Sequence, residues 1–168
     1  DVERHGHTTL FTTNRPERLN ALGGTVRADL AAGMRAFQDD PDQYVAVITG
    51  AGDKAFCPGA DLKELASNAG TGRRLPASSV PDIGGGGACE KITIAAINGL
   101  AVGGGVELAA CCDIRIASEH AWFGLSEVSR GVLSGVGVSL LPRLMPFGVV
   151  ADMMLSGERL SAQDAWRT

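Results

Sequence analysis

The amino-acid sequence predicts a layered α/β fold in a single domain. Two apolar runs, residues 44–49 and 92–97, lack the alternation of a half-exposed sheet and are typical of strands that are covered on both faces. A helical pattern precedes the first run, since apolar residues recur about every four positions, at Leu22, Val26, Leu30, Met34 and Phe37. Strands that alternate with helices in this way indicate a layered α/β protein. A length of 168 residues suits one domain.

Composition excludes several function classes. The chain is 45% hydrophobic and 20% charged, which is typical of a soluble globular protein with a packed core. Fifteen Lys and Arg residues against nineteen Asp and Glu residues give a net charge of −4. This balance argues against a polybasic nucleic-acid or membrane binder. The first residues are charged, and the longest uncharged stretch, residues 93–106, is interrupted by Asn98 and by glycines. We therefore expect a cytoplasmic protein with no membrane span and no signal peptide.

The cysteines indicate a reducing compartment. The chain has four of them, at Cys57, Cys89, Cys111 and Cys112. No pair has CxxC spacing and no histidine lies at metal-ligand spacing, so we expect no metal site. Two cysteines are adjacent, which does not suit a disulfide framework. We expect all four thiols at apolar core positions.

The remaining elements follow in chain order. A strand is predicted at residues 7–13 and is ended by the Asn14-Arg15-Pro16 turn. Asn20 is a candidate N-cap for the first helix, which Pro41 stops. Residues 67–91 are rich in Gly, Pro and Ser and predict a surface loop. A buried helix is expected at 106–112, short strands at 114–116 and 121–123, and helices at 136–144 and 147–155.

Residues 55–64 form the first candidate site segment. A Pro58-Gly59 turn follows a predicted buried strand and leads into a helix that begins at Asp61. Amide groups at such a helix start have no partners within the helix and can point at an anion or a polarised carbonyl. The alternative is a tight loop that Asp61 merely caps.

Residues 98–108 form the second segment. Three consecutive glycines, Gly103 to Gly105, stand between a buried strand and a buried helix and allow close approach to the backbone. A dinucleotide-binding fingerprint would need Gly or Ala where Leu108 stands, so that interpretation fails. Glu107 is a carboxylate in an otherwise apolar helix, and burial there is costly unless the charge is paired. The alternative is that Glu107 faces solvent or caps its own helix.

Glu127 provides a second acid. One helix and a pair of short strands separate it from Glu107 in the sequence, which is enough chain to bring both carboxylates to one cleft. Alone, Glu127 would be read as an ordinary loop acid. Cys57 is an alternative nucleophile, but no histidine accompanies it at a recognisable position.

These segments together resemble the enoyl-CoA hydratase/isomerase (crotonase) superfamily. The resemblance lies in residues 14–22, 56–64, 94–113 and 123–128, and above all in the GADLKE and AAINGLAVGGGVEL motifs in that order. It implies a fold of repeated β-β-α units. It also implies that residues 1–168 are one core domain, truncated relative to the family and without the family's usual C-terminal helical region.

The resemblance also implies a mechanism. The backbone amides of Ala60 and Gly104 would form an oxyanion hole for the thioester oxygen of an acyl-CoA. Glu107 would activate a water molecule that attacks C3 of a 2-enoyl-CoA, and Glu127 would deliver the proton to C2. The CoA path would be lined by Glu17, Arg18, Leu19, Pro58, Ala60, Asp61, Leu62 and Lys63.

The expected activity is therefore an enoyl-CoA hydratase that needs no metal or separate cofactor, since coenzyme A belongs to the substrate. The family suggests a homo-oligomer, a trimer or a hexamer. Three alternatives stay open. They are an enoyl-CoA isomerase, a specialised acyl-CoA hydratase or lyase, and a non-catalytic domain that binds CoA thioesters or acts as a scaffold.

Overall fold

The computed structural model describes residues 1–68 and 89–168, and its strands form two sheets. The first has the order β1-β2-β3-β5-β7, and β1 is its antiparallel strand. The second has the order β4-β6-β8-β9, with β9 antiparallel. The strands are β1 (Val2–His5), β2 (Thr8–Thr13), β3 (Val45–Gly50), β4 (Ala55–Cys57), β5 (Ile92–Ile97), β6 (Leu100–Val102), β7 (Ile114–Ala117), β8 (Trp122–Gly124) and β9 (Leu160–Ser161).

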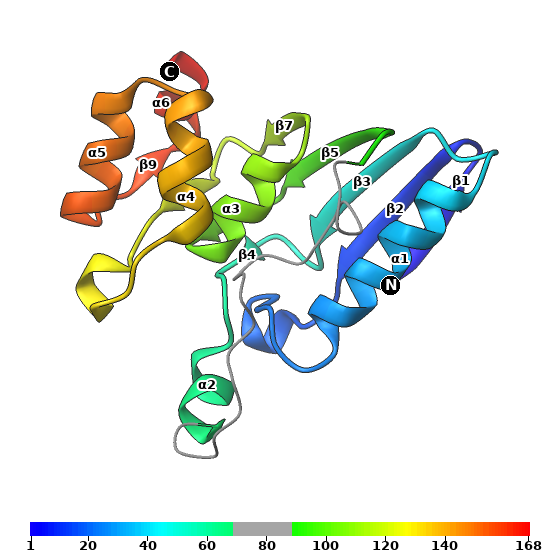
Figure 1. Cartoon of the computed structure of the whole chain (residues 1–168), viewed down its shortest axis with the longest axis horizontal. Coiled ribbons are helices and arrows are strands. Elements are labelled where there is room, and N and C mark those ends of the chain that lie inside the picture. The colour runs from blue at the N-terminus through cyan, green and yellow to red at the C-terminus, as the bar shows by residue number, and fades with distance from the viewer. Residues whose placement is uncertain (69–88) are drawn as a thin grey trace.

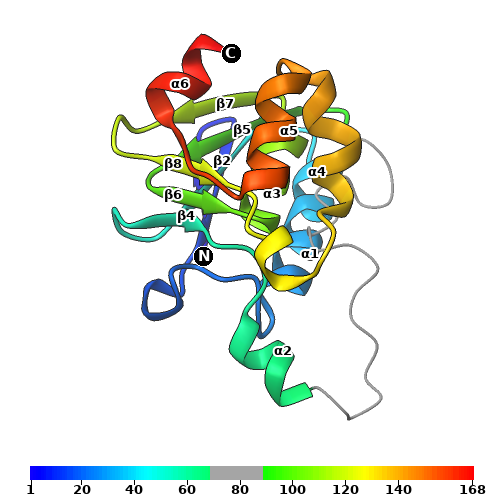
Figure 2. The ribbon, with the colours of Figure 1, turned by 90° about the vertical axis from the view of Figure 1, so that its left-hand side faces the viewer.

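A β-β-α unit repeats along the chain. A longer strand enters the first sheet, a short strand enters the second, and a helix follows, as in β3-β4-α2, β5-β6-α3 and β7-β8-α4 (Figures 1 and 2). The helices are α1 (Val26–Asp39), α2 (Leu62–Asn68), α3 (Gly104–Cys111), α4 (Gly135–Leu140), α5 (Phe147–Ser156) and α6 (Ala162–Arg167), with short 3-10 turns at Pro16–Arg18, Val128–Arg130 and Leu141–Arg143. The predicted layered fold of repeated units is confirmed.

Helix α1 packs on the first sheet through the predicted apolar residues. Met34 and Phe37 are buried against it, and Phe37 meets the ring of Phe11 edge-on at 6.4 Å between centroids. Gly33 lets the helix approach, because a Cβ there would stand 2.7 Å from Phe11 Cε1. Strands β3 and β5 alternate between buried and more exposed positions. The expectation of full cover on both faces is therefore wrong within the described residues.

Element boundaries differ from the predictions where tertiary contacts decide them. Helix α1 begins at Val26 and not near Asn20, and Leu22 instead pairs with Ala60 in an isolated parallel bridge. Helix α3 begins two residues early, at Gly104. The last predicted strands and helices lie within a few residues of those observed. Most of the predicted loop at 67–91 falls on residues 69–88, which lie outside the described residues.

Asn20 connects the loop after β2 to the segment between β3 and β4. It is 1% exposed and adopts a left-handed conformation with φ of 63°. Its Nδ2 donates hydrogen bonds to the carbonyl oxygens of Ala51 and Ala55, and its Oδ1 accepts one from the Arg15 amide. Asn tolerates this conformation better than most residues, so the predicted helix cap is in fact a connector between loops.

Replacing Asn20 with Ala should therefore destabilise the fold. Three hydrogen bonds at about 1 kcal/mol each give a loss of about 3 kcal/mol in the free energy of unfolding. Urea denaturation measures it. The matched control is Asn14→Ala, because Asn14 makes one exposed contact with Asp1 and its loss should cost less than about 1 kcal/mol. Equal losses in both variants would contradict the connecting role.

Candidate functional site

The two glycine-containing segments predicted to bind a substrate oxygen lie against each other. A Cβ on Gly105 would stand 1.9 Å from the Cys57 carbonyl oxygen, so the start of α3 packs directly on the end of β4. A Cβ on Gly59 would stand 3.0 Å from the Gly104 amide nitrogen. Strands β4 and β6 pair in parallel and place both turns at the same edge of the second sheet (Figure 2). The structure thus brings the turn at Ala60 to the start of α3.

The amides of Ala60 and Gly104 are available as donors at this point. The Leu22 amide donates to the Gly59 carbonyl oxygen over 2.8 Å, which fixes the turn without using the Ala60 amide. Gly104 is the first residue of α3, whose first amides have no acceptor within the helix. Across residues 1–68 and 89–168, neither amide donates a hydrogen bond. The pair has the composition of an oxyanion hole, with one donor at a helix N-terminus.

Glu107 is buried completely, with 0% of its surface exposed. Its Oε1 accepts hydrogen bonds from the Ser134 hydroxyl at 2.8 Å and from the amides of Val136 and Gly137, each at 3.0 Å. These amides belong to the first turn of α4, so the carboxylate caps a neighbouring helix. Both simple alternatives, exposure to solvent and capping of its own helix, are wrong. Three donors on one oxygen suit an ionised carboxylate, which only accepts.

Glu127 lies close to Glu107 at the same edge. A Cβ on Gly103 would stand 2.8 Å from Glu127 Oε1, so the carboxylate lies directly over the glycine turn. Its Oε2 is buried and accepts no hydrogen bond from any described residue. Burial, and to a lesser degree the charge of Glu107, raise the pKa of Glu127 above the ordinary glutamate range. One acid is thus held as an acceptor, and the other is biased toward its protonated form.

The raised pKa of Glu127 predicts a pH-dependent stability. Between the pKa of an unfolded glutamate and the higher pKa of Glu127, the native state binds the extra proton. The free energy of unfolding therefore falls as pH rises through that window. Glu127→Gln should remove this part of the fall when urea denaturation is compared at pH 5 and pH 8. Glu119→Gln, at an exposed glutamate, is the control, and parallel pH profiles for all three proteins would contradict the prediction.

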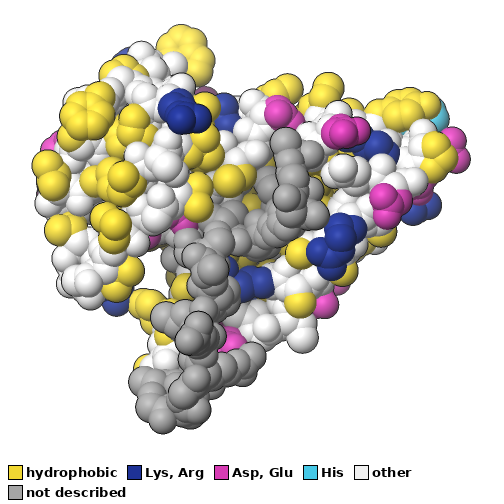
Figure 3. Space-filling model, viewed as in Figure 1, with side chains coloured by type: hydrophobic (Ala, Val, Ile, Leu, Met, Phe, Trp, Pro, Cys, Tyr) yellow, Lys and Arg dark blue, Asp and Glu magenta, His cyan; other side chains and the backbone are white. Residues whose placement is uncertain are grey.

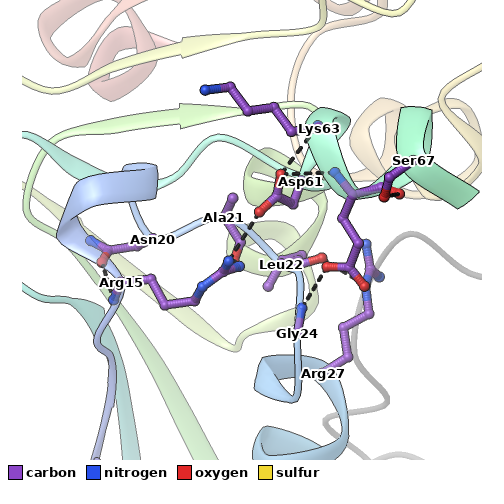
Figure 4. Close-up of polar contacts among 10 residues, drawn as sticks. Arg15, Asn20, Ala21, Leu22, Gly24, Arg27, Asp61, Lys63 and Ser67 are labelled. Atoms are coloured by element: carbon purple, nitrogen blue, oxygen red, sulfur yellow. Dashed lines mark hydrogen bonds and ion pairs between the residues drawn. The ribbon is translucent and has the colours of Figure 1, made fainter.

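The residues predicted to line the CoA path divide into inward and outward sets. Asp61 is 7% exposed; it accepts from Arg15 at 3.0 Å and from the amides of Lys63 and Glu64 (Figure 4). Burial alone would raise the pKa of Asp61, but the hydrogen bonds from the Glu64 amide and Arg15 and the charges of Arg18 and Arg15 hold that pKa below its usual range. Asp61 is therefore an anchor for the start of α2.

The other members of this set are more accessible. Leu62, Lys63, Glu17 and Arg18 are exposed or half-exposed, Pro58 is half-buried, and Leu19 is 39% exposed with φ of 53°. Glu64 connects α2 to the loop before α1, since its Oε2 accepts from the Gly24 amide at 2.6 Å. The loop at residues 22–24 therefore lies beside residues 60–64, and Figure 4 shows Leu22 and Gly24 next to Asp61 and the start of α2.

Sequence reasoning missed Arg15 and Ser134. Arg15 Nη1 donates to the Ala21 carbonyl oxygen, and the ion pair of Arg15 with Asp61 joins the 3-10 turn to the start of α2 (Figure 4). Ser134 stands immediately before a helix and could have been read as an N-cap from its type alone. Its contact with Glu107 spans 27 positions in the sequence, and no local pattern encodes it.

The thiols are only partly where the sequence predicts them. Cys57 and Cys112 are buried, but Cys89 is half-buried and Cys111 is exposed, so the expectation of four core thiols is wrong. Cys111 lies at the end of α3, where the helix emerges at the surface. Burial raises the pKa of Cys57 to about 12, which disfavours the thiolate that a nucleophile needs.

A cavity of about 830 Å³ lies along a different face of α3. Its lining includes Val106, Ala109 and Ala110, which follow helical spacing and exclude Glu107. None of the predicted site residues lines it. Within the described parts of the chain, no helix is both long and apolar enough to span a bilayer.

Comparisons with known proteins agree on one family. The family model for enoyl-CoA hydratase/isomerase matches residues 3–168. The chain is 43% identical to (E)-benzylidenesuccinyl-CoA hydratase of Thauera aromatica and 35% identical to a short-chain-enoyl-CoA hydratase of Clostridium acetobutylicum. In each case 99% of this chain is aligned, covering 65% and 64% of the relative.

Solved structures give the same result. An enoyl-CoA hydratase from Mycobacterium tuberculosis superposes with a TM-score of 0.88 at 33% identity, and a carnitinyl-CoA hydratase from Mycobacterium avium with 0.86 at 42% identity. Each match covers 99% of this chain and 64% of the solved chain. The chain therefore spans just under two thirds of the length of these relatives, and over that span it belongs to the enoyl-CoA hydratase/isomerase family.

Proposed function

We propose that the protein hydrates a 2-enoyl-CoA thioester to a 3-hydroxyacyl-CoA. The observation that carries this proposal is the meeting of two differently held carboxylates, Glu107 and Glu127, at the glycine turn that begins α3. Membership of the family and the hydratase names of its relatives support it.

The two amides would supply electrostatic stabilisation. Addition of water to the conjugated double bond places negative charge on the thioester oxygen as an enolate. The amides of Ala60 and Gly104 would donate to that oxygen, and each such donor is typically worth about 3 kcal/mol of transition-state stabilisation. The close packing of Gly105 on Cys57 would keep the two donors in place before the substrate arrives.

The two acids would divide the proton transfers. Glu107 would accept a proton from water as its oxygen bonds to C3, and Glu127 would donate its own proton to C2. The product gains the water hydroxyl at C3 and the Glu127 proton at C2, which leaves Glu107 protonated and Glu127 ionised. Transfer of that proton from Glu107 to Glu127 would restore the starting state. Unequal environments are what such a division needs, and the raised pKa of Glu127 favours the protonated form that a proton donor requires.

The substrate contacts are proposed on the same basis. The outward residues near Lys63 and Arg18 would border the CoA moiety, which enters as part of the substrate and not as a separate cofactor. We also propose a cytoplasmic homo-oligomer. Exposed apolar side chains gathered over α4 and α5, including Val138, Phe147 and Leu155, support assembly (Figure 3).

A product assay tests the proposed function. Incubation with short-chain and aryl-substituted 2-enoyl-CoA should consume the conjugated thioester and yield 3-hydroxyacyl-CoA, with one oxygen from labelled water detected by mass spectrometry. Conversion of a 3-enoyl-CoA to the 2-enoyl isomer without incorporation of labelled oxygen would favour isomerisation instead. Tight acyl-CoA binding without conversion of any of these thioesters would favour a non-catalytic domain.

A further inference from the structure

Ser134 makes an unusual contact for a residue in its position. It is the N-cap residue of α4 and is 3% exposed, yet its side chain accepts no hydrogen bond from that helix. Its hydroxyl instead donates to Glu107 Oε1 over 2.8 Å. The carboxylate accepts from the α4 amides in its place. An N-cap serine usually accepts from the first amides of its helix, but here an acid on another helix is the acceptor.

We propose that Ser134 is a positioning residue, which holds the Glu107 carboxylate in its reactive orientation. This inference rests on the proposed hydration reaction. Among the described residues, the donors to Oε1 are the Ser134 side chain and two amides that are fixed by the backbone of α4. Three donors converge on Oε1, so this is the oxygen by which the carboxylate is held.

The packing around Ser134 is shaped for this contact. A Cβ on Gly137 would stand 2.2 Å from the Ser134 hydroxyl oxygen and 3.2 Å from its Cβ. The absence of a side chain at 137 therefore makes room for the hydroxyl, while the amide of the same residue reaches the same carboxylate oxygen. Ser134 and Gly137 therefore pack together and both donate to the Glu107 carboxylate.

The physical benefit is orientation. A glutamate side chain has three rotatable bonds, and a displacement of about 1 Å at a reacting group is enough to cost about a hundredfold in rate. A hydrogen bond to a charged group holds the carboxylate more strongly than one between neutral groups. Because Ser134 touches Glu107 and not the substrate, its loss should slow the chemical step and leave substrate binding nearly unchanged.

The test is steady-state kinetics of Ser134→Ala with a 2-enoyl-CoA that the wild-type protein hydrates. We expect kcat to fall at least about tenfold, while KM changes by less than about twofold. Ser139→Ala is the matched control, since this hydroxyl lies on the same helix and, among the described residues, bonds only to the carbonyl oxygens of Gly135 and Val136. It should retain wild-type kcat.

A second pair of variants separates function from folding. Ser134→Thr and Ser134→Val have the same shape and differ in the hydroxyl, so any packing strain is common to both. We expect the threonine variant to be at least about fivefold faster than the valine variant at equal thermal midpoints. Equal kcat in this pair, or wild-type kcat in Ser134→Ala, would overturn the role of Ser134 while hydration by the wild-type protein stands. A wild-type protein without hydratase turnover would overturn the proposed function and this inference together.

Discussion

Replacing Glu107 with glutamine should lower kcat for hydration by about 10²–10⁴-fold, the usual contribution of a general base. The amide keeps an oxygen that can accept from Ser134 and from the α4 amides, so the helix cap survives. It cannot take up the proton of the attacking water. The measurement is the initial rate of 3-hydroxyacyl-CoA formation at saturating substrate.

The control for Glu107→Gln is a variant that removes the same charge at a glutamate outside the candidate site. Glu119→Gln alters an exposed glutamate between β7 and β8 and should keep the wild-type rate. Thermal midpoints of both variants verify that the fold is intact. A kcat for Glu107→Gln within about threefold of the wild-type value would show that Glu107 is only the cap of α4.

Replacing Gly103 with alanine should remove most activity as well. Gly103 has φ of 53° and ψ of −120°, a conformation that side chains disfavour, and the new Cβ would stand 2.8 Å from Glu127 Oε1. The methyl group should displace the acid and shift the start of α3 together with the Gly104 amide. We expect a loss of about 10²-fold or more in kcat/KM and about 1–3 kcal/mol in stability.

A second glycine separates the two effects of that methyl group, which are backbone strain at positive φ and the clash with Glu127. Gly131 also has positive φ, of 65°, but a Cβ there would meet nothing within 4 Å. Gly131→Ala should therefore show a loss of stability with kcat/KM near the wild-type value. If Gly103→Ala and Gly131→Ala lose activity to the same extent, the contact between Gly103 and Glu127 has no special role.

The strands and the apolar faces of helices could be predicted because local pattern decides them. The runs at residues 44–49 and 92–97 became β3 and β5, and Met34 and Phe37 bury the face of α1 that their spacing predicts. The prediction that Asn20 is the N-cap of α1 was wrong because tertiary contacts hold Asn20 elsewhere. Asn20 makes its hydrogen bonds to Ala51 and Ala55, more than 30 positions away, and these outweigh its capping preference.

In the candidate site, too, local features could be predicted and long-range contacts could not. The glycine turns and the acids Glu107 and Glu127 could be picked out from residue type and from family resemblance. Their surroundings could not, since the contact of Glu107 with Ser134 and that of Glu127 with Gly103 join elements that are distant in sequence. The different states of the two carboxylates arise from those surroundings. The sequence alone therefore indicates which acids are candidates, but neither their contacts nor how each acid is held.

The central claim is that the amides of Ala60 and Gly104 hold the thioester oxygen while Glu107 and Glu127 face C3 and C2. A crystal structure of the Glu107→Gln variant with a bound 2-enoyl-CoA tests it most directly. We predict the thioester oxygen about 3 Å from both amide nitrogens, with the double bond between the side chains at 107 and 127. A thioester oxygen remote from both amides, for example with the acyl chain in the cavity lined by Met153 and Trp166, would contradict the account.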